Sequence, residues 1–386
     1  MNILMINYEY PPLGGGGGVF TRDLANELAG DHNVDVLTTH FRGLEKKEVK
    51  NGVNIYRVPV LNRTSLHTAT MSSMLTFLFS AVMKGIRLCA NKKYHVINTH
   101  FAVPTGPVGL VLSRVFNIPD VLSVHGGDIY DPSKKTSPHR HALLRLAVRT
   151  VLNSASAVVA QSQNTRDNAG RFYKPSKDIA VIPLGIPAPV FTPVDREKLS
   201  MRKGSFYIIS IGRLIKRKGY DHLIISLAVA RERAQNLELI LIGDGPERDA
   251  LNELSIRTGL KDRVTFLSSV SEEKKFQYLA AADMYVLSSL HEGFGIVLLE
   301  AMSCGLPVVA TDQGGQTDII APDRNGILVP PRDETKLAEA ILDLAMDDRR
   351  RREISENNRS AAARYSISAV SRRYVKLFKD TTGADA

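Results

Sequence analysis

Two glutamates, Glu292 and Glu300, flank a glycine-bearing turn in the segment HEGFGIVLLEAMSCG, residues 291–305. An apolar run follows the turn, and this order predicts a strand, a polar loop, a short helix and a further strand. Glycine lets backbone approach a ligand closely, and a helix start offers unpaired N–H groups to an anion. One carboxylate would lie before the helix and the other about one turn inside it. Both could then accept hydrogen bonds from ligand hydroxyl groups, such as those of a sugar.

This segment resembles the E-x7-E motif of retaining glycosyltransferases with the GT-B fold, in particular family 4. Two glutamates alone could be solvated surface charges, but the complete string, with its Gly-Phe-Gly turn and Pro-Val-Val exit, is far more specific. The resemblance implies that Glu292 and nearby backbone amides hold the donor sugar, and that Glu300 holds the ribose hydroxyls. The residues that supply those amides are Phe294, Gly295, Ile296 and Val297.

A basic loop, IGRLIKRKGYD at residues 211–221, resembles the G-R-L-x-x-x-K-G loop of the same family. By that resemblance Arg213 and Lys218 contact the donor phosphates, whereas Lys216 and Arg217 between them are expected to be solvated. A departing nucleoside diphosphate gains negative charge, which fixed cations can stabilise without a metal ion. The sequence contains no His/Cys/carboxylate cluster with metal-ligand spacing, so we expect neither a metal nor another cofactor.

Three further motifs follow predicted strands. In VLSVHGGD, His125 and Asp128 match an H-G-x-D string of the family, which implies that His125 lies next to the transferring sugar. A lone histidine is more often structural, but the carboxyl end of a parallel strand is where α/β folds bind ligands. In LILIGDGPE, Gly243 matches a turn below the nucleotide, and Val270 falls where relatives hold the base.

The first predicted strand leads into a loop with five glycines, Gly14 to Gly18. It does not fit the dinucleotide-binding pattern G-x-G-x-x-G, because Val19, Phe20 and Thr21 stand where a further glycine is required. The loop instead resembles the P-P-x-x-G-G loop of the family, with Gly15 and Gly16 as the matching pair. The resemblance implies that this pair approaches the donor diphosphate and the acceptor; the alternative is a flexible turn.

The elements that must position these residues alternate as strand, helix and strand along 386 residues, too many for one core. The expected strands are Asn2–Asn7, Val34–Thr39, Asn54–Val60, His95–Thr99, Val121–His125, Ala157–Ala160, Ile179–Ile182, Phe206–Ile211, Leu237–Ile242, Val264–Leu267, Met284–Leu287 and Val308–Ala310. We expect the α/β class and a GT-B architecture, with two Rossmann-like, doubly wound parallel-sheet domains facing each other across a cleft. The expected segments are an acceptor-side domain at 1–186, a proline-rich linker at 187–200, a nucleotide-sugar domain at 201–364, and a helix and tail at 365–386 that return to the first domain.

The formal net charge of +10 suggests an anionic partner: a nucleotide-sugar, nucleic acid or an anionic membrane. Nucleic acid is not expected, because aromatic and basic residues are not interleaved and no known module is present. The apolar stretch 74–89 is interrupted by Lys84 and Arg87, so we expect a buried or half-buried helix and not a membrane span. A basic cluster could contact an anionic leaflet or be an ordinary solvated helix face. Its members are Lys134, Lys135, Arg140, His141, Arg145 and Arg149.

Together these features predict a retaining glycosyltransferase that moves a sugar from a UDP- or GDP-linked donor to a hydroxyl acceptor. The transfer would serve the biosynthesis of a glycan, a glycolipid or a surface polysaccharide. Lipid-linked sugars, surface polysaccharides and small metabolites are all open as the acceptor. A nucleotide-sugar 2-epimerase and a non-catalytic nucleotide-sugar-binding protein are the alternatives. With two cysteines and no signal-peptide pattern, we expect a cytoplasmic protein, with peripheral contact at the inner face of the cell membrane as a further option.

Overall fold

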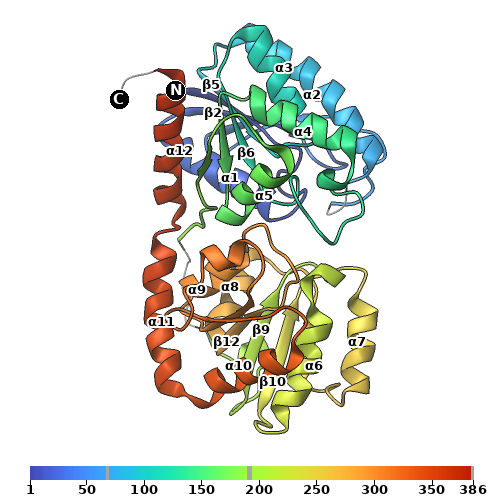
Figure 1. Ribbon diagram of the computed structural model, residues 1–386, viewed down its shortest axis with the longest axis vertical. Helices are drawn as coiled ribbons and strands as arrows, with labels where there is room; N and C mark the ends of the chain where they lie inside the picture. Colours follow the sequence, from blue (N-terminus) through green and yellow to red (C-terminus); the bar gives the residue numbers. More distant parts are fainter. Residues whose placement is uncertain (67–68, 189–193, 384–386) are drawn as a thin grey trace. The chain divides into compact units, whose positions relative to one another are not determined.

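The computed structural model describes residues 1–66, 69–188 and 194–383, which form two compact units (Figure 1). The N-terminal unit contains residues 1–187 together with the last segment, 366–386, and the C-terminal unit contains residues 188–365. The sequence predicts the boundaries at 186/187 and 364/365, and part of its predicted linker, residues 189–193, lies outside the described residues.

The N-terminal unit is built on an eight-stranded sheet with the order β3-β4-β2-β1-β5-β6-β7-β8. Its described strand pairs are parallel except β3 with β4. The strands are β1 (Asn2–Ile6), β2 (Asn33–Thr39), β3 (Lys47–Lys50), β4 (Val53–Val58), β5 (Val96–His100), β6 (Asp120–Val124), β7 (Ala157–Ala160) and β8 (Ile179–Val181). The strand β3 was missed by the sequence prediction, because its sequence KEVK is charged and largely exposed at the sheet edge.

Helices cover both faces of this sheet (Figure 1). They are α1 (Gly16–Leu28), α2 (Met71–Asn91), α3 (Gly106–Phe116), α4 (Ala142–Ser154), α5 (Gln163–Tyr173) and α12 (Ile367–Thr382). Phe77 of α2 and Leu112 of α3 pack with Leu4 and Ile97 in one core. On the other face, Phe20 of α1 lies near Tyr374 of α12, whose hydroxyl lies 3.1 Å from Ser123 Oγ. The last helix is therefore part of the N-terminal unit.

The C-terminal unit contains a six-stranded parallel sheet with the order β11-β10-β9-β12-β13-β14. Its strands are β9 (Phe206–Ile211), β10 (Leu237–Ile242), β11 (Val264–Leu267), β12 (Met284–Leu287), β13 (Val308–Thr311) and β14 (Ile327–Val329). Its helices are α6 (Tyr220–Arg231), α7 (Arg248–Arg257), α8 (Glu272–Ala281), α9 (Ile296–Ser303), α10 (Glu334–Met346) and α11 (Asp348–Ala363). Strands β9 and β10 are buried on both faces, which is why they read as continuous apolar runs.

In each sheet, the direction in which the chain adds successive strands reverses at one place. In the N-terminal unit the strand order reverses between β1 and β5, and in the C-terminal unit it reverses between β9 and β12. Loops that leave the carboxyl ends of such neighbouring strands diverge, and the crevice between them is the usual ligand site of open α/β sheets. Each unit therefore presents one such point, and the sequence-predicted site residues are found near both.

Candidate functional site

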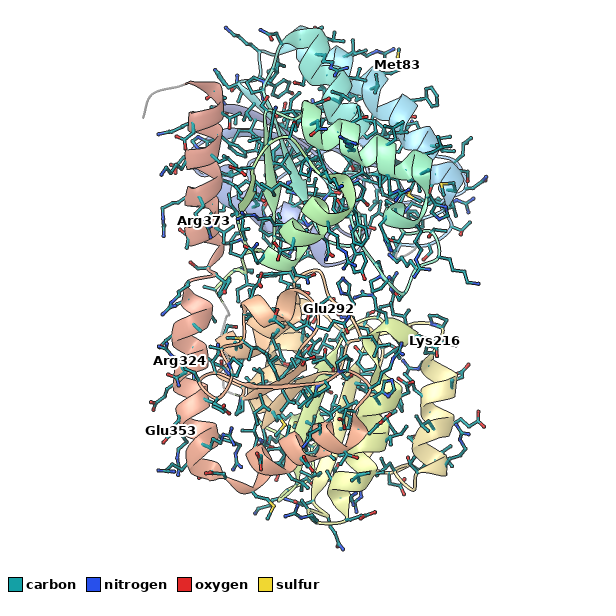
Figure 2. The ribbon with its side chains drawn as sticks, in the orientation of Figure 1. Met83, Lys216, Glu292, Arg324, Glu353 and Arg373 are labelled. Atoms are coloured by element: carbon teal, nitrogen blue, oxygen red, sulfur yellow. The ribbon has the colours of Figure 1, made fainter. Side chains whose placement is uncertain are left out.

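The C-terminal unit brings Lys218 and Glu292 into direct contact at its switch point. Lys218 ends the short 3-10 helix Lys216–Lys218 after β9, and Glu292 lies in the loop after β12. Lys218 Nζ donates to Glu292 Oε1 at 2.7 Å, and Ser289 Oγ donates to the same oxygen at 2.7 Å. The two motifs that were recognised separately in the sequence thus form one charged centre. Glu292 is labelled in Figure 2.

Arg217 completes this centre, and its predicted solvation was wrong. Arg217 Nη1 lies 3.1 Å from Glu292 Oε2, and the same nitrogen donates to the carbonyl of His291. The side chain is only 19% exposed, whereas its neighbour Lys216 is exposed to solvent. One turn of 3-10 helix points consecutive residues in different directions, which residue types alone do not reveal.

The ionisation state of Glu292 follows from these neighbours. Burial opposes the charged form, but Arg217 and Lys218 outweigh it and hold the pKa of the carboxyl well below its usual range. Lys218 carries three protons, one of which points to Glu292. The centre therefore combines an ionised carboxylate with a lysine, Lys218, that keeps donor capacity for an anionic ligand.

Two close backbone approaches hold the loops in place. Gly219 has a left-handed φ of 61°, and a Cβ there would lie 2.3 Å from the carbonyl oxygen of Ser288. The Ser288 hydroxyl in turn donates to the carbonyl of Lys218 at 2.9 Å. On the other side Gly315 N donates to the Glu292 carbonyl at 2.8 Å, and a Cβ on Gly315 would meet the Gly293 carbonyl. Glycine at these positions lets three loops meet around the charged pair.

Glu300 lies one turn inside α9 and is held by a partner that the sequence did not suggest. Its Oε1 accepts a hydrogen bond from Lys275 Nζ at 2.8 Å, and Lys275 also donates to Glu272 Oε2 at 2.8 Å. Lys275 comes from α8, and burial opposes its charge, but Glu300 and Glu272 outweigh burial and raise its pKa. In the sequence, Lys275 is one lysine of a regular helix, and lysines are too common in helices for this one to be recognised as a partner of Glu300.

The remaining predicted donor residues of the C-terminal unit lie at the same carboxyl edge. Ile296 and Val297 form the first turn of α9 after Gly295, where backbone N–H groups lack intrahelical acceptors and no acidic side chain competes for them. Arg213 is exposed after β9, and Val270 is half-buried after β11. The buried Phe294 ring packs 6.1 Å from that of Tyr365, and at Gly243 a Cβ would lie 2.0 Å from the carbonyl oxygen of Gly212.

In the N-terminal unit, His125 follows β6 and is 8% exposed. Its backbone N–H donates to Asp128 Oδ1 at 2.9 Å, and Asp128 Oδ2 accepts from Ala102 N at 2.6 Å. Gln161 donates to the His125 carbonyl, and the Phe101 ring lies 4.4 Å from the imidazole. Asp128 therefore fixes the backbone after β6, and its pKa is raised to about 6, because burial outweighs the hydrogen bonds from the backbone.

A buried hydrogen-bond chain determines which nitrogen of His125 carries the proton. Asn98 uses its amide group to donate to Val121 O and Ser123 Oγ, so its Oδ1 must accept from His100 Nε2, 2.9 Å away. Burial lowers the pKa of both histidines, to about 4 for His125 and well below its ordinary value for His100, so both rings are neutral at pH 7. His100 Nδ1 is then an acceptor, and His125 Nε2, at 3.0 Å, must be the donor.

This chain of hydrogen bonds leaves His125 Nδ1 as an unprotonated acceptor. Among the described residues this buried nitrogen has no hydrogen-bond partner. A Cβ built on Gly17 would lie 3.4 Å from it, so the nitrogen lies beside the glycine segment. His100 was not singled out in the sequence, because its contact with His125 exists only where β5 and β6 end side by side.

The glycine segment is less loop-like than predicted. Helix α1 begins at Gly16, inside the predicted loop, with Gly15 as its N-cap and no acidic residue in its first turn. Gly15 N donates to Glu9 Oε2 at 3.2 Å. At Gly17 a Cβ would approach the Phe101 ring to 2.6 Å, so glycine is what allows the helix to start so close to His125. The predicted pair Gly15-Gly16 therefore forms a helix N-terminus, which favours anions.

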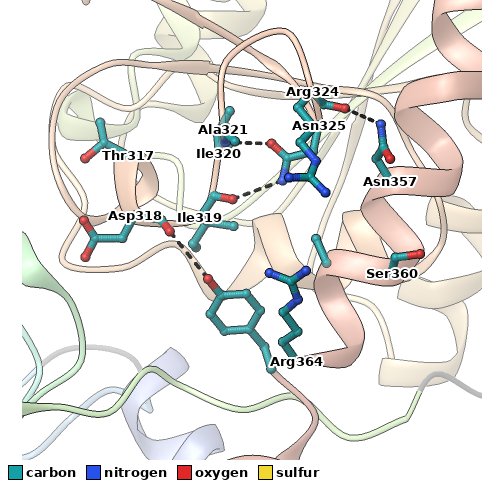
Figure 3. Close-up of a pocket in the computed structure, with 12 residues that line it drawn as sticks. Thr317, Asp318, Ile319, Ile320, Ala321, Arg324, Asn325, Asn357, Ser360 and Arg364 are labelled. Atoms are coloured by element: carbon teal, nitrogen blue, oxygen red, sulfur yellow. Dashed lines mark hydrogen bonds between the residues drawn. The ribbon is translucent and has the colours of Figure 1, made fainter.

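Two other features bear on ligands. In the described part of the chain, no group of three or more His, Cys, Asp or Glu side chains could hold a metal ion. A hollow of about 400 Å³ lies between residues 317–325 and the end of α11 (Figure 3). Asn325 and Asn357 there hydrogen-bond to the backbone of Ile319, Ala321 and Arg324. These hydrogen bonds hold the backbone that lines the hollow, which is separate from the Lys218–Glu292 centre.

Comparison with known proteins gives consistent results. The family models "Glycosyltransferase Family 4" and "Glycosyl transferases group 1" match residues 14–188 and 191–361. An uncharacterised glycosyltransferase of Methanocaldococcus jannaschii is 30% identical over 98% of this chain and 98% of its own. A GDP-mannose-dependent alpha-(1-6)-phosphatidylinositol monomannoside mannosyltransferase of Mycolicibacterium smegmatis is 26% identical over 90% of both. The solved sucrose-phosphate synthase of Thermosynechococcus elongatus superposes with a TM-score of 0.87 at 26% identity, covering 100% of both chains.

Proposed function

The chain belongs to glycosyltransferase family 4 and has the GT-B fold, and from this we propose a retaining transfer of a sugar from a UDP- or GDP-linked donor to a hydroxyl acceptor. Its relatives make it a glycosyltransferase that uses a nucleotide-sugar. We propose three further properties: retention of the anomeric configuration, UDP or GDP as the nucleotide of the donor, and a role in the biosynthesis of a glycan, glycolipid or surface polysaccharide. The observation that carries the proposal is the Lys218–Glu292 pair at the switch point of the C-terminal sheet.

Lys218 and Arg213 would hold the donor diphosphate. As the glycosidic bond breaks, negative charge develops on the leaving phosphate, and cations that are already in place stabilise it without reorganisation. Lys218 is fixed by Glu292 on one side and by the loop contact with Ser288 on the other. The N–H groups at the start of α9 would add partial positive charge from the same edge of the sheet. We propose that these groups serve in place of a metal ion.

Glu292 is suited to binding and not to proton donation. Its carboxyl is ionised at all physiological pH values; Oε1 accepts hydrogen bonds from Lys218 and Ser289, and Oε2 forms an ion pair with Arg217. An ionised carboxylate cannot be a general acid, and one with both oxygens engaged is a weak nucleophile. Its remaining lone pairs can accept hydrogen bonds from sugar hydroxyls. The acceptor hydroxyl would then lose its proton to the leaving phosphate on the same face, which gives retention.

His125 and Glu300 would complete the donor contacts. His125 Nδ1 is a neutral acceptor, so it can receive a hydrogen bond from a sugar hydroxyl but carries no charge to the reaction centre. Lys275 donates a hydrogen bond to Glu300 inside α9, and Glu300 would accept hydrogen bonds from the ribose hydroxyls. An epimerase would need a group that donates a proton to the sugar ring, and a histidine with a pKa of about 4 is a poor proton donor at pH 7.

The test is to incubate the purified protein with UDP- and GDP-sugars and to follow the products by NMR. A transferase slowly hydrolyses its donor when no acceptor is present, and retention predicts that the first free sugar has the anomeric configuration of the donor. A first product of opposite configuration would overturn retention. An isomerised nucleotide-sugar would indicate an epimerase, and binding without turnover would indicate a protein that has lost catalysis.

A further inference from the structure

Helix α2 has an unusual outer face. Its buried side chains recur every fourth residue from Ser73 to Cys89 and pack on the sheet and on α3. The opposite face carries large apolar side chains at the same interval, each more than half exposed: Met71, Leu75, Phe79 and Met83. Phe79 is 77% exposed, and Met83 projects from the outer side of the helix (Figure 2). A soluble helix normally places polar residues on this face.

The apolar surface continues across the two neighbouring helices. Val111 and Val115 are exposed on α3, and Leu143 and Leu146 are exposed on α4, Leu143 to 82%. The helices α2, α3 and α4 lie next to one another (Figure 1). Together they carry eight of the thirteen large apolar side chains that are exposed in the described part of the chain. We call the outer surface formed by these eight residues the α2–α4 face.

The charge of the α2–α4 face has one sign. None of the three helices contains an aspartate or a glutamate, and Arg87, Arg114, Arg145 and Arg149 are exposed on them. The preceding loop adds Lys134, Lys135 and Arg140, also exposed. The two acidic residues of that loop, Asp128 and Asp131, are buried. Asp131 Oδ1 accepts from the backbone N–H and the hydroxyl of Ser133, and Asp131 Oδ2 lies 3.5 Å from Lys134 Nζ. On these three helices and the preceding loop, apolar side chains thus lie among cations, and no acidic residue is exposed.

We propose that the α2–α4 face docks on an anionic lipid bilayer, with α2 lying on the membrane. By length and hydropathy α2 could cross a membrane, contrary to the expectation from residues 74–89, and only 28% of its most apolar window is buried. It is nevertheless attached to the domain along its whole length: at Gly85 a Cβ would lie 2.4 Å from Leu112 Cδ1, so α2 and α3 pack in close contact. A helix with one face fixed in a domain core and the other apolar and flanked by cations fits the interfacial position.

A second copy of the chain fits this face less well. A two-fold interface pairs a surface with itself, so it would bring the exposed arginines of both copies together with no carboxylate to pair with them. An anionic headgroup layer supplies the missing charge, and the acyl region accepts Phe79 and Leu143. Docking of this kind would give the enzyme access to a hydroxyl acceptor at the membrane surface, in line with the lipid-linked option above.

The experiment is flotation of the full-length protein with two kinds of vesicle: phosphatidylcholine alone, and equal parts of phosphatidylcholine and phosphatidylglycerol. We expect binding to the anionic vesicles, weakened by salt. The pairs Leu75→Ser with Phe79→Ser and Arg145→Glu with Arg149→Glu should each lower the partition coefficient about tenfold or more. The pair Val229→Ser with Ile256→Ser, at exposed positions of the C-terminal unit, should bind like the unchanged protein.

Two outcomes would overturn the proposal. One is binding that is absent or indifferent to anionic lipid and to both pairs of substitutions. The other is a dimer in light scattering that both pairs of substitutions dissociate, which would assign the face to a second copy. Donor hydrolysis in solution should be unchanged in all three variants, because none touches the Lys218–Glu292 centre. Failure of docking is therefore distinguishable from failure of the proposed chemistry.

Discussion

Lys218 Nζ and Glu292 Oε1 lie 2.7 Å apart, although 74 residues separate them in the sequence. The contact joins the loop after β9 to the loop after β12, which are neighbouring strands of one sheet. A basic loop and a glutamate motif that resemble parts of one family therefore become a single centre when the chain folds. The stability and the chemistry of the C-terminal unit should both depend on it.

Replacing Glu292 should destabilise the protein in a pH-dependent manner. Glu292→Gln leaves Arg217 and Lys218 partly buried without their counter-charge, and we expect the free energy of unfolding to fall by about 3 kcal/mol at neutral pH. Because the folded pKa lies below the ordinary 4.5, this contribution is present above pH 4.5 and is lost as pH falls further. Urea denaturation at several pH values measures it. The exposed Glu353 is the control: Glu353→Gln should change stability little at any pH.

His125 should be a neutral histidine with the proton on Nε2. In protein labelled with 15N-histidine, we expect the Nδ1 resonance of an unprotonated nitrogen at pH 7, and protonation only near pH 4, well below the usual 6.5. His100→Phe removes the acceptor for Nε2–H and should mix the two tautomers, whereas His100→Asn offers an amide oxygen and should preserve the preference in part. A protonated Nδ1 in the unchanged protein, or titration near pH 6.5, contradicts the proposed chain of hydrogen bonds.

Lys275 should matter for donor binding through Glu300. Lys275→Met removes the ammonium group 2.8 Å from Glu300 and should raise the KM for the donor about tenfold, with a smaller change in kcat. Glu272→Gln removes the other carboxylate that contacts the same lysine and should leave the KM unchanged, because Glu272 is mostly solvated. Steady-state kinetics of donor hydrolysis distinguishes the variants. Equal effects of both substitutions would mean that Lys275 is only structural.

Gly219 and Gly259 allow a matched test of the loop geometry. Both have a left-handed φ, 61° and 73°, but only at Gly219 would a Cβ collide, 2.3 Å from the Ser288 carbonyl. Gly259→Ala should cost about 1 kcal/mol from the backbone conformation alone. Gly219→Ala should cost more and should also weaken nucleotide binding, because Lys218 precedes it. If the two variants behave alike in both unfolding and binding assays, the close approach does not position Lys218.

The sequence predicted the framework of the sheets well. Strands β9 to β12 were predicted with the bounds that the structure shows, since each is a short apolar run between turn residues. The sequence-based prediction missed two strands. One is β3, which is charged and lies at the edge of the N-terminal sheet, and the other is β14, which has only three residues and lies at the edge of the C-terminal sheet. Both are edge strands, where a single buried face or a short length leaves little pattern to read.

The site was predictable as motifs but not as contacts. Glu292 and Lys218 stood out through spacing and neighbouring glycines, whereas nothing in the sequence KRK distinguishes Arg217, which pairs with Glu292, from Lys216, which is solvated. Lys275 reaches Glu300 from another helix, and His100 reaches His125 from a neighbouring strand. Contacts of this kind depend on register and side-chain direction, which only the folded chain defines.

The most direct measurement is titration calorimetry of UDP and GDP with the unchanged protein, Lys218→Ala and Lys216→Ala. These lysines lie two residues apart, but only Lys218 contacts Glu292. We predict that one nucleotide binds the unchanged protein and the Lys216→Ala variant with similar affinity, and that Lys218→Ala weakens it at least about tenfold. Equal binding by both variants, or no binding of either nucleotide, would contradict a diphosphate site at the Lys218–Glu292 centre.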